Sequence, residues 1–235
     1  MSTSFESLDL GQTREWQELH PEVVRPRSVG GWNPETFAQQ QIRGLVQRVF
    51  LSHSDRPARQ VVFSAVDGAT DIRQICRRIA SALADETSKS VAVMSAGPQL
   101  LQNIGEHESA VDSQSRDASM PPLRRIATKL RENLWQVPPP GRNPATASSL
   151  HSYLGEMRRE FEYSIVEAPP AGESNEAIAM AQFADGIILV VSAQRTRRAA
   201  AVKIKESLEA AKARLLGTVL IDRLFPIPEK IYRRL

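Results

Sequence analysis

Nine residues occupy positions at which a phosphate group or a metal ion could bind, each at or just beyond the end of an apolar stretch. They are Asp67, Gly68, Thr70, Asp71, Ile72, Arg73, Ser95, Gly97 and Glu167. A glycine loop after a strand can offer backbone N–H groups to phosphate oxygens, and hydroxyl and carboxylate groups can hold magnesium. In doubly wound folds, ligands bind outside the carboxyl ends of the strands, so we expect the nine residues at one edge of a sheet.

The elements that must position these residues alternate between strands and helices. Apolar, β-branched runs predict strands at 60–66, 90–94, 163–168, 186–192 and 217–222, with a shorter one at 134–137. Helical spacing of apolar residues predicts helices at 35–50, 71–84, 149–161, 176–184 and 197–215. A strand, a helix and a second strand in succession form a βαβ unit, which requires a parallel sheet and a right-handed crossover. The sequence therefore predicts an α/β fold with a doubly wound, mainly parallel sheet and helices on both faces.

The rest of the chain predicts one domain with two irregular segments. Residues 1–33 are polar and contain Pro21, Pro26 and Gly30, so we expect a flexible N-terminal arm. Residues 34–235 then form a single α/β domain, in which Asn33 can cap the first helix. About 98–122 the sequence is polar without periodicity, and we expect a mobile insertion there.

The composition argues against several classes of partner and of cellular location. The net charge is +3 over 235 residues, and the basic residues are spread over several helices, which argues against a nucleic-acid partner. A single cysteine, Cys76, excludes an internal disulfide and a cysteine-based zinc site. The longest apolar stretch, 186–193, is too short to cross a bilayer. We expect a cytoplasmic protein that reaches the inner membrane, if at all, through a partner.

The second half of the sequence resembles a known family. The stretch 161–170, FEYSIVEAPP, is similar to the segment FDYVIIDTPP of the bacterial exopolysaccharide and capsule tyrosine kinases (BY-kinases). The segments ADGIILVV at 184–191 and LGTVL at 216–220 follow in the family's order. This resemblance spans about residues 35–225 and implies the P-loop NTPase fold of the wider MinD/ParA-type superfamily.

The resemblance also implies that nucleotide chemistry has been lost. When Ser64 and Ala65 are aligned with the start of the family's phosphate loop, Asp71 takes the place of the phosphate-binding lysine. Ile72 takes the place of the hydroxyl that holds magnesium, and Gly68 is the one family glycine that remains. Ser95 and Gly97 replace two acidic residues, and Glu167 replaces an aspartate. We therefore expect no catalytic residues, no metal and no nucleotide cofactor.

Several interpretations remain open at this stage. The segment 67–73 could be an ordinary turn between strand and helix, with Asp67 or Thr70 capping the helix. The function that we favour is an inactive accessory or regulatory protein of exopolysaccharide or capsule biosynthesis and export. It would bind a membrane chain-length (copolymerase) protein or an active kinase paralogue, and homo-oligomers remain an option. The alternatives are an active ATPase or tyrosine kinase that uses ATP, Mg²⁺, Arg73 and Glu167, and a positioning ATPase like MinD or ParA.

Overall fold

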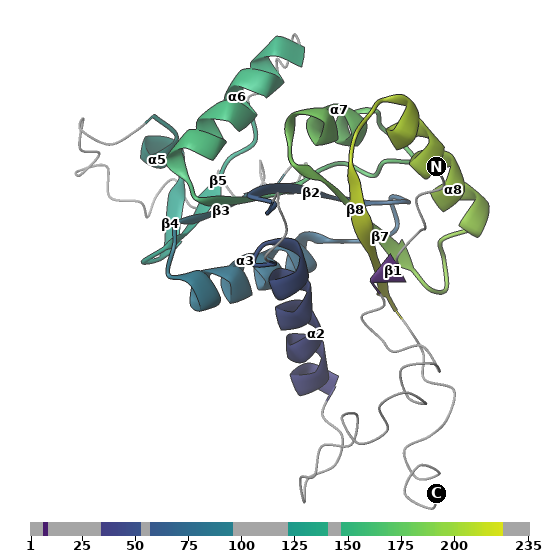
Figure 1. The fold of residues 1–235 in the computed structure, drawn as a ribbon, viewed down its shortest axis with the longest axis horizontal. Coiled ribbons are helices and arrows are strands. Elements are labelled where there is room, and N and C mark those ends of the chain that lie inside the picture. The colour runs from purple at the N-terminus through teal and green to yellow at the C-terminus, as the bar shows by residue number, and fades with distance from the viewer. Residues whose placement is uncertain (1–6, 9–33, 53–56, 96–121, 141–146, 223–235) are drawn as a thin grey trace, which may run out of the picture.

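Within the described part of the chain, an eight-stranded sheet forms the centre of the fold (Figure 1). The computed structural model describes residues 7–8, 34–52, 57–95, 122–140 and 147–222. The strands lie in the order β1-β8-β7-β2-β6-β3-β5-β4, and all neighbours are parallel except β4 and β5. Their bounds are β1 Ser7–Leu8, β2 Gln60–Ala65, β3 Val91–Ser95, β4 Thr128–Arg131, β5 Leu134–Val137, β6 Tyr163–Glu167, β7 Gly186–Ser192 and β8 Leu215–Ile221.

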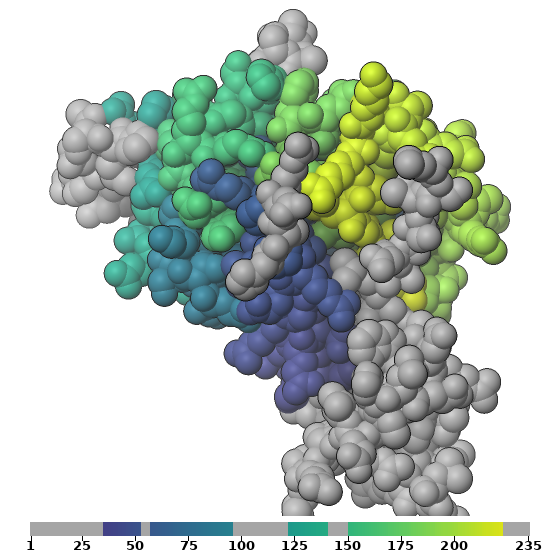
Figure 2. Space-filling model, in the orientation of Figure 1, coloured from purple at the N-terminus to yellow at the C-terminus, as the bar shows by residue number. Residues whose placement is uncertain are grey.

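Helices cover both faces of the sheet, as the sequence predicts. One face carries α2 (Pro34–Val49) and α3 (Arg73–Thr87). The other carries α5 (Pro122–Ile126), α6 (Ala147–Glu160), α7 (Glu176–Phe183) and α8 (Arg198–Ala210). In Figure 2, α2 and α3 fill the lower part of the described surface, and the green and yellow helices fill the upper part. The fold is thus the expected doubly wound α/β fold.

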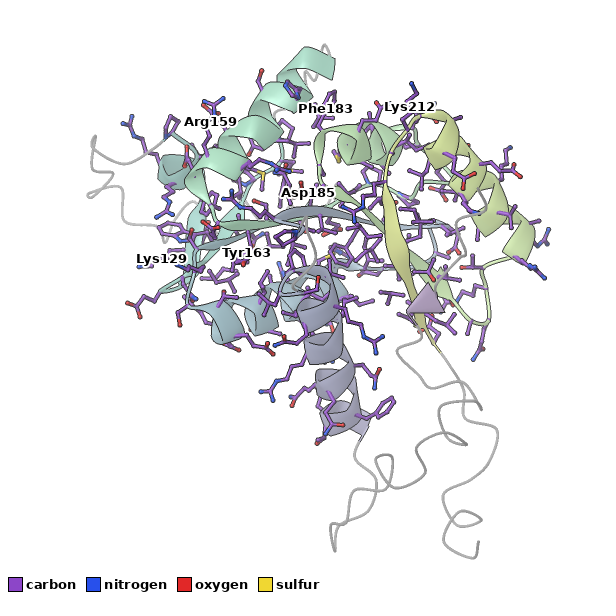
Figure 3. All side chains as sticks on the ribbon, viewed as in Figure 1. Lys129, Arg159, Tyr163, Phe183, Asp185 and Lys212 are labelled. Carbon is purple, nitrogen blue, oxygen red and sulfur yellow. The ribbon has the colours of Figure 1, made fainter. Side chains whose placement is uncertain are left out.

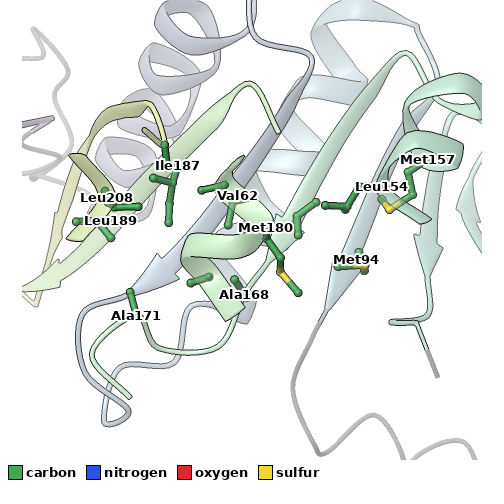
Figure 4. Close-up of a cluster of buried hydrophobic side chains, with 14 of the residues drawn as sticks. Val62, Met94, Leu154, Met157, Ala168, Ala171, Met180, Ile187, Leu189 and Leu208 are labelled. Atoms are coloured by element: carbon green, nitrogen blue, oxygen red, sulfur yellow. The ribbon is translucent and has the colours of Figure 1, made fainter. Parts of the chain in front are cut away.

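The two helical layers produce two hydrophobic cores that share the sheet. In β2, Val62 faces the α6–α8 layer, whereas Val61 and Phe63 face the α2–α3 layer. All six residues of β2 are buried because helices cover both faces of this strand. Figure 4 shows the first core, in which Leu154 of α6, Met180 of α7 and other apolar side chains gather on the sheet.

The last helix is shorter than its sequence predicts. We expected it to reach Leu215, but α8 ends at Ala210 and Leu215 is the first residue of β8. Lys212 adopts φ 56°, and the N–H of Ala213 donates to the carbonyl of Leu208 over 2.9 Å, which closes the last turn. The chain must then turn back early, because Leu215 pairs with Ile187 of β7.

The hairpin of β4 and β5 was predicted only in part. The strand at 134–137 is confirmed as β5, but β4 was not predicted, because all four of its residues are exposed and give no apolar pattern. The register shifts between Lys129 and Arg131, so Leu130 is a bulged residue. β4 forms one end of the sheet in the described chain.

Some predictions fall outside the described residues. The arm 1–33 is described only at Ser7–Leu8, which pair with Thr218 and Val219 of β8. Asn33, Gly97 and most of the expected insertion 98–122 are not described. No helix in the described ranges is long and apolar enough to cross a membrane.

Candidate functional site

The carboxyl ends of β2, β6 and β3 bring the predicted site residues to one edge of the sheet. These three strands are neighbours, and Ser95 lies in register with Glu167. The loop 67–72 leaves the same edge from β2 and leads into α3. The described site residues therefore lie at one edge of the sheet, as we expect from the sequence, because parallel strands end on the same side.

Asp67 organises the first turn of the loop. Its carboxylate accepts a hydrogen bond from the Thr70 hydroxyl at 2.9 Å and one from the Thr196 hydroxyl at 2.6 Å. The bond from Thr196 is the main cause that holds the pKa of Asp67 below its usual value. Thr196 belongs to the turn after β7, so this carboxylate ties two loops together that are far apart in the sequence.

Asp71 and Arg73 form an ion pair at the start of α3. The Asp71 carboxylate accepts two bonds from the Arg73 guanidinium, at 3.0 and 2.8 Å, and one from the Arg73 main-chain N–H at 3.0 Å. These contacts with Arg73 lower the pKa of Asp71. The N-cap residue of α3 is Ile72, which has no capping side chain, and the Arg73 N–H bonds to Asp71 instead of Asp67 or Thr70, which corrects the capping prediction. The side chains of Asp67 and Thr70 are instead bonded to each other, and Asp67 also accepts a bond from Thr196. The Ile72 side chain is buried in the core of the α2–α3 layer.

Ser95 and Glu167 form a buried pair between β3 and β6. The Ser95 hydroxyl donates a hydrogen bond to the Glu167 carboxylate, and only 7% of Glu167 is exposed. Burial raises the pKa of Glu167, because an ionised carboxylate loses its hydration there, and the bond from Ser95 partly offsets this effect. Cys76 of α3 is also buried, and desolvation raises the pKa of its thiol well above the usual value.

A second loop, residues 169–174, packs along the first. The Ala171 and Gly172 N–H groups donate to the carbonyls of Ala65 and Val66, and the Ser64 hydroxyl donates to the Pro169 carbonyl. The carboxylate of Glu173 accepts a bond from the main-chain N–H of Gly68 at 2.9 Å. The loop begins with Pro169 and Pro170, the end of the stretch 161–170 that resembles the family, whereas the sequence gives no indication of a role for Glu173.

The turn 193–197 contacts the other side of loop 67–70. The Arg195 guanidinium donates to the Ala69 carbonyl at 3.0 Å, next to the bond between Thr196 and Asp67. Sequence reasoning missed both residues, which lie more than a hundred positions from their partners. A resemblance to a family loop gives no signal for such contacts, because they depend on the tertiary fold alone.

The chemistry available at this edge is limited by these internal contacts. Asp67, Asp71 and Glu167 each accept hydrogen bonds from protein groups. Within the described ranges, no group of three His, Cys, Asp or Glu side chains could hold a metal ion. The edge is thus a polar surface with its loops bonded to one another.

The chain resembles known proteins over part of its sequence. No family model matches the chain. Over 90 residues it is 33% identical to the tyrosine-protein kinase CpsD of Streptococcus agalactiae serotype III, and the match covers 36% of this chain and 39% of that protein. The chain thus matches well under half the length of this curated relative.

Solved structures extend the likeness over the whole fold. The kinase domain of the Escherichia coli tyrosine kinase ETK superposes with a TM-score of 0.65 at 12% identity, covering 95% of this chain and 93% of that one. The MinD cell division protein of Aquifex aeolicus gives a TM-score of 0.52 at 18% identity, covering 75% and 73%. At such identities the likeness shows the fold, which is that of the P-loop ATPases.

Proposed function

Because this chain is related to the bacterial capsule tyrosine kinases and has the P-loop fold of MinD and ParA, we propose that it is a catalytically inactive accessory protein. It acts in the biosynthesis and export of a capsule or exopolysaccharide, and it works by binding another protein. Homology to capsule kinases supports the pathway. The inactivity and the binding role are inferred from the loop described above.

The observation that carries the proposal is the ion pair of Asp71 and Arg73. Asp71 stands where the family's loop has its phosphate-binding lysine, and its carboxylate is held by the Arg73 guanidinium and main-chain N–H. An entering phosphate would meet a carboxylate at this position. An unpaired carboxylate 4 Å from a unit negative charge would repel it by about 4 kcal/mol at an effective dielectric constant of about 20. The ion pair with Arg73 offsets part of this repulsion, but it also occupies the guanidinium that could otherwise attract the phosphate. Because about 1.4 kcal/mol corresponds to a tenfold change in affinity, such a loop is a poor nucleotide site.

The remaining residues do not fit a magnesium nucleotide either. Ile72, at the position of the magnesium-binding hydroxyl, is apolar and buried. Glu167 is buried against Ser95 with a raised pKa, so its carboxylate is less able to stay ionised for a cation.

The partner that we propose is a membrane chain-length (copolymerase) protein or an active kinase paralogue. The binding surface is the carboxyl edge of the sheet, formed by loops 67–72, 169–174 and 193–197. Arg195 and Glu173 are exposed on this edge and can contact a partner. The surface has the same position as the ligand sites of doubly wound folds.

Calorimetry tests the loss of nucleotide binding. ATP and ADP with Mg²⁺ are titrated into the full chain, and we expect no binding heat at about millimolar nucleotide. Micromolar affinity would overturn the proposal. ATP turnover that disappears in Glu167→Ala would instead support an active enzyme.

A co-purification experiment tests the binding role. The full chain is mixed with the cytoplasmic part of a candidate chain-length (copolymerase) protein, with and without ATP. We expect capture in both conditions, weakened by Arg195→Glu at the carboxyl edge. The matched control is Lys203→Glu, an equal charge reversal on the exposed side of α8. Equal weakening by both variants would contradict the proposed surface.

A further inference from the structure

We propose that Glu173 acts as an internal anion, which takes the place of a phosphate at the Gly68 N–H and locks loop 67–70 in one conformation without nucleotide. The inference rests on the proposed function in one respect, since a loop with no nucleotide to bind needs another partner for its N–H groups. Its evidence is separate from the pair of Asp71 and Arg73.

The first step is the closeness of Glu173 and Gly68. The Gly68 N–H donates to Glu173 Oε1 over 2.9 Å, a normal length for a hydrogen bond to a carboxylate. A Cβ atom added to Gly68 would lie 2.3 Å from the same oxygen. The carboxylate therefore rests directly on the glycine backbone, where a side chain at position 68 would exclude it. Gly68 is also the one glycine that this loop shares with the family's phosphate loop.

The second step is how the chain places Glu173. Loop 169–174 is bonded to the end of β2 by the N–H groups of Ala171 and Gly172, at 2.9 and 3.1 Å from their acceptor carbonyls. The backbone approaches so closely at Gly172 that an added Cβ would lie 2.4 Å from the Val66 carbonyl oxygen. These bonds place the backbone at Glu173 beside loop 67–70, within reach of the Gly68 N–H.

The third step is the contact on the opposite side of the loop. Thr196 donates to Asp67, and Arg195 donates to the Ala69 carbonyl. The Thr196 hydroxyl also accepts the Ser192 N–H at 3.0 Å, which connects this turn to the end of β7. Loop 67–70 is therefore held between two neighbouring loops. Three of its four residues bond to these loops, from Asp67 to Ala69.

Amide hydrogen exchange without nucleotide tests the lock. In Glu173→Ala, we expect the exchange of residues 67–70 to accelerate by roughly tenfold, the effect of losing one hydrogen bond to a charged acceptor. Glu173→Gln keeps an accepting oxygen without the charge, so its acceleration should be smaller. Glu176→Ala is the matched control, because it removes an exposed carboxylate three residues further on. Exchange in Glu173→Ala no faster than in Glu176→Ala would overturn the inference.

A second variant tests the same contact with every charge kept. Gly68→Ala places its methyl group against the Glu173 carboxylate, which must move away. We expect loop 67–70 to exchange faster, as in Glu173→Ala, while β7 keeps its protection. Unchanged exchange of the loop would count against the lock. Because no nucleotide is present, these outcomes are independent of the calorimetric test: ATP binding by the natural protein defeats the proposed function, and slow exchange in both variants defeats the lock.

Discussion

The carboxylate of Asp185, which is labelled in Figure 3, accepts a hydrogen bond from the main-chain N–H of Gln60 at 2.8 Å and joins the amino ends of β7 and β2. It also accepts the Arg59 N–H and the Arg158 guanidinium, each at 2.7 Å. Asp185 thus satisfies two backbone donors at the edge opposite the candidate site. This contact holds two central strands of the sheet in register and should matter for stability.

Asp185→Ala should therefore destabilise the protein by about 2–3 kcal/mol, because two N–H groups lose a charged acceptor. Chemical denaturation of the two proteins measures this difference. Asp85→Ala is the control, since it breaks an exposed ion pair with Arg131, and it should cost about 0.5 kcal/mol or less. Equal effects of the two variants would show that the backbone contacts of Asp185 contribute little.

The same carboxylate gives a dependence on acid. Burial opposes its ionisation, but the bonds from Arg158 and the two N–H groups outweigh burial and lower the pKa of Asp185. A carboxylate with a lowered folded pKa stabilises the protein above its unfolded pKa, about 3.9. That stability is lost as the pH falls through the folded pKa. Asp185→Asn should remove this part of the acid-induced loss, as measured by the unfolding free energy between about pH 2 and 6.

Glu167 should give the opposite pH dependence. Its folded pKa is raised by burial, so its contribution to stability is present below the unfolded pKa and is lost as the pH rises through the folded value. The unfolding free energy of Glu167→Gln, relative to that of the natural protein, should therefore increase as the pH rises from about 4 to about 8. Unfolding at several pH values measures the difference. A constant difference over this range would show that Glu167 titrates as it does in the unfolded chain.

Leu208 of α8 is fully buried in the core of the α6–α8 layer, whereas Val202 of the same helix is 40% exposed. Leu208→Ala should lower the free energy of unfolding by about 2–5 kcal/mol, through lost apolar contact and the cavity that remains. Val202→Ala should change it by less than about 0.5 kcal/mol. Thermal and denaturant unfolding check both values, and a tolerant position 208 would mean that α8 packs loosely on the sheet.

Two glycines should respond to alanine in opposite directions. A Cβ on Gly186 would lie 2.5 Å from the Arg214 carbonyl oxygen, so Gly186→Ala must push β7 and the start of β8 apart. We expect a loss of about 1–3 kcal/mol. Gly44 lies inside α2 with no atom within 4 Å of the added position, and Gly44→Ala should stabilise the protein by about 0.5–1 kcal/mol. Denaturation curves of the two variants test the pair, and a shift in the same direction for both would contradict this account.

The sequence predicts the central strands well because their composition reflects where they lie. β2, β6 and β7 are covered by helices on both faces, so nearly all of their residues are buried and most are apolar. β4 has no such cover and therefore no apolar pattern. The end of α8 was placed too late because Ala210–Ala213 has a helix-forming composition, and the turn at Lys212 is set by pairing of β8 with β7.

The sequence predicts where the candidate site lies, but it does not predict most of the contacts within the site. Asp71 and Glu167 follow from the resemblance to a family loop and from strand ends. Glu173, Arg195 and Thr196 are polar residues in turns, where any sequence has such residues. Their importance arises from contacts between segments distant in the chain, which a single sequence does not record.

The bulged strand β4 has a consequence for how molecules meet in concentrated solution. Its backbone forms one end of the sheet in the described chain, and such an end can extend into a neighbouring molecule. Two copies aligned strand to strand would bring Lys129 and Arg131 of each against those of the other. These like charges repel, although the ion pair of Arg131 with Asp85 offsets part of the repulsion. The kink at Leu130 also prevents a long, flat match. At high concentration, molecules should therefore not pair through the β4 edge, and fibre growth through that edge is disfavoured.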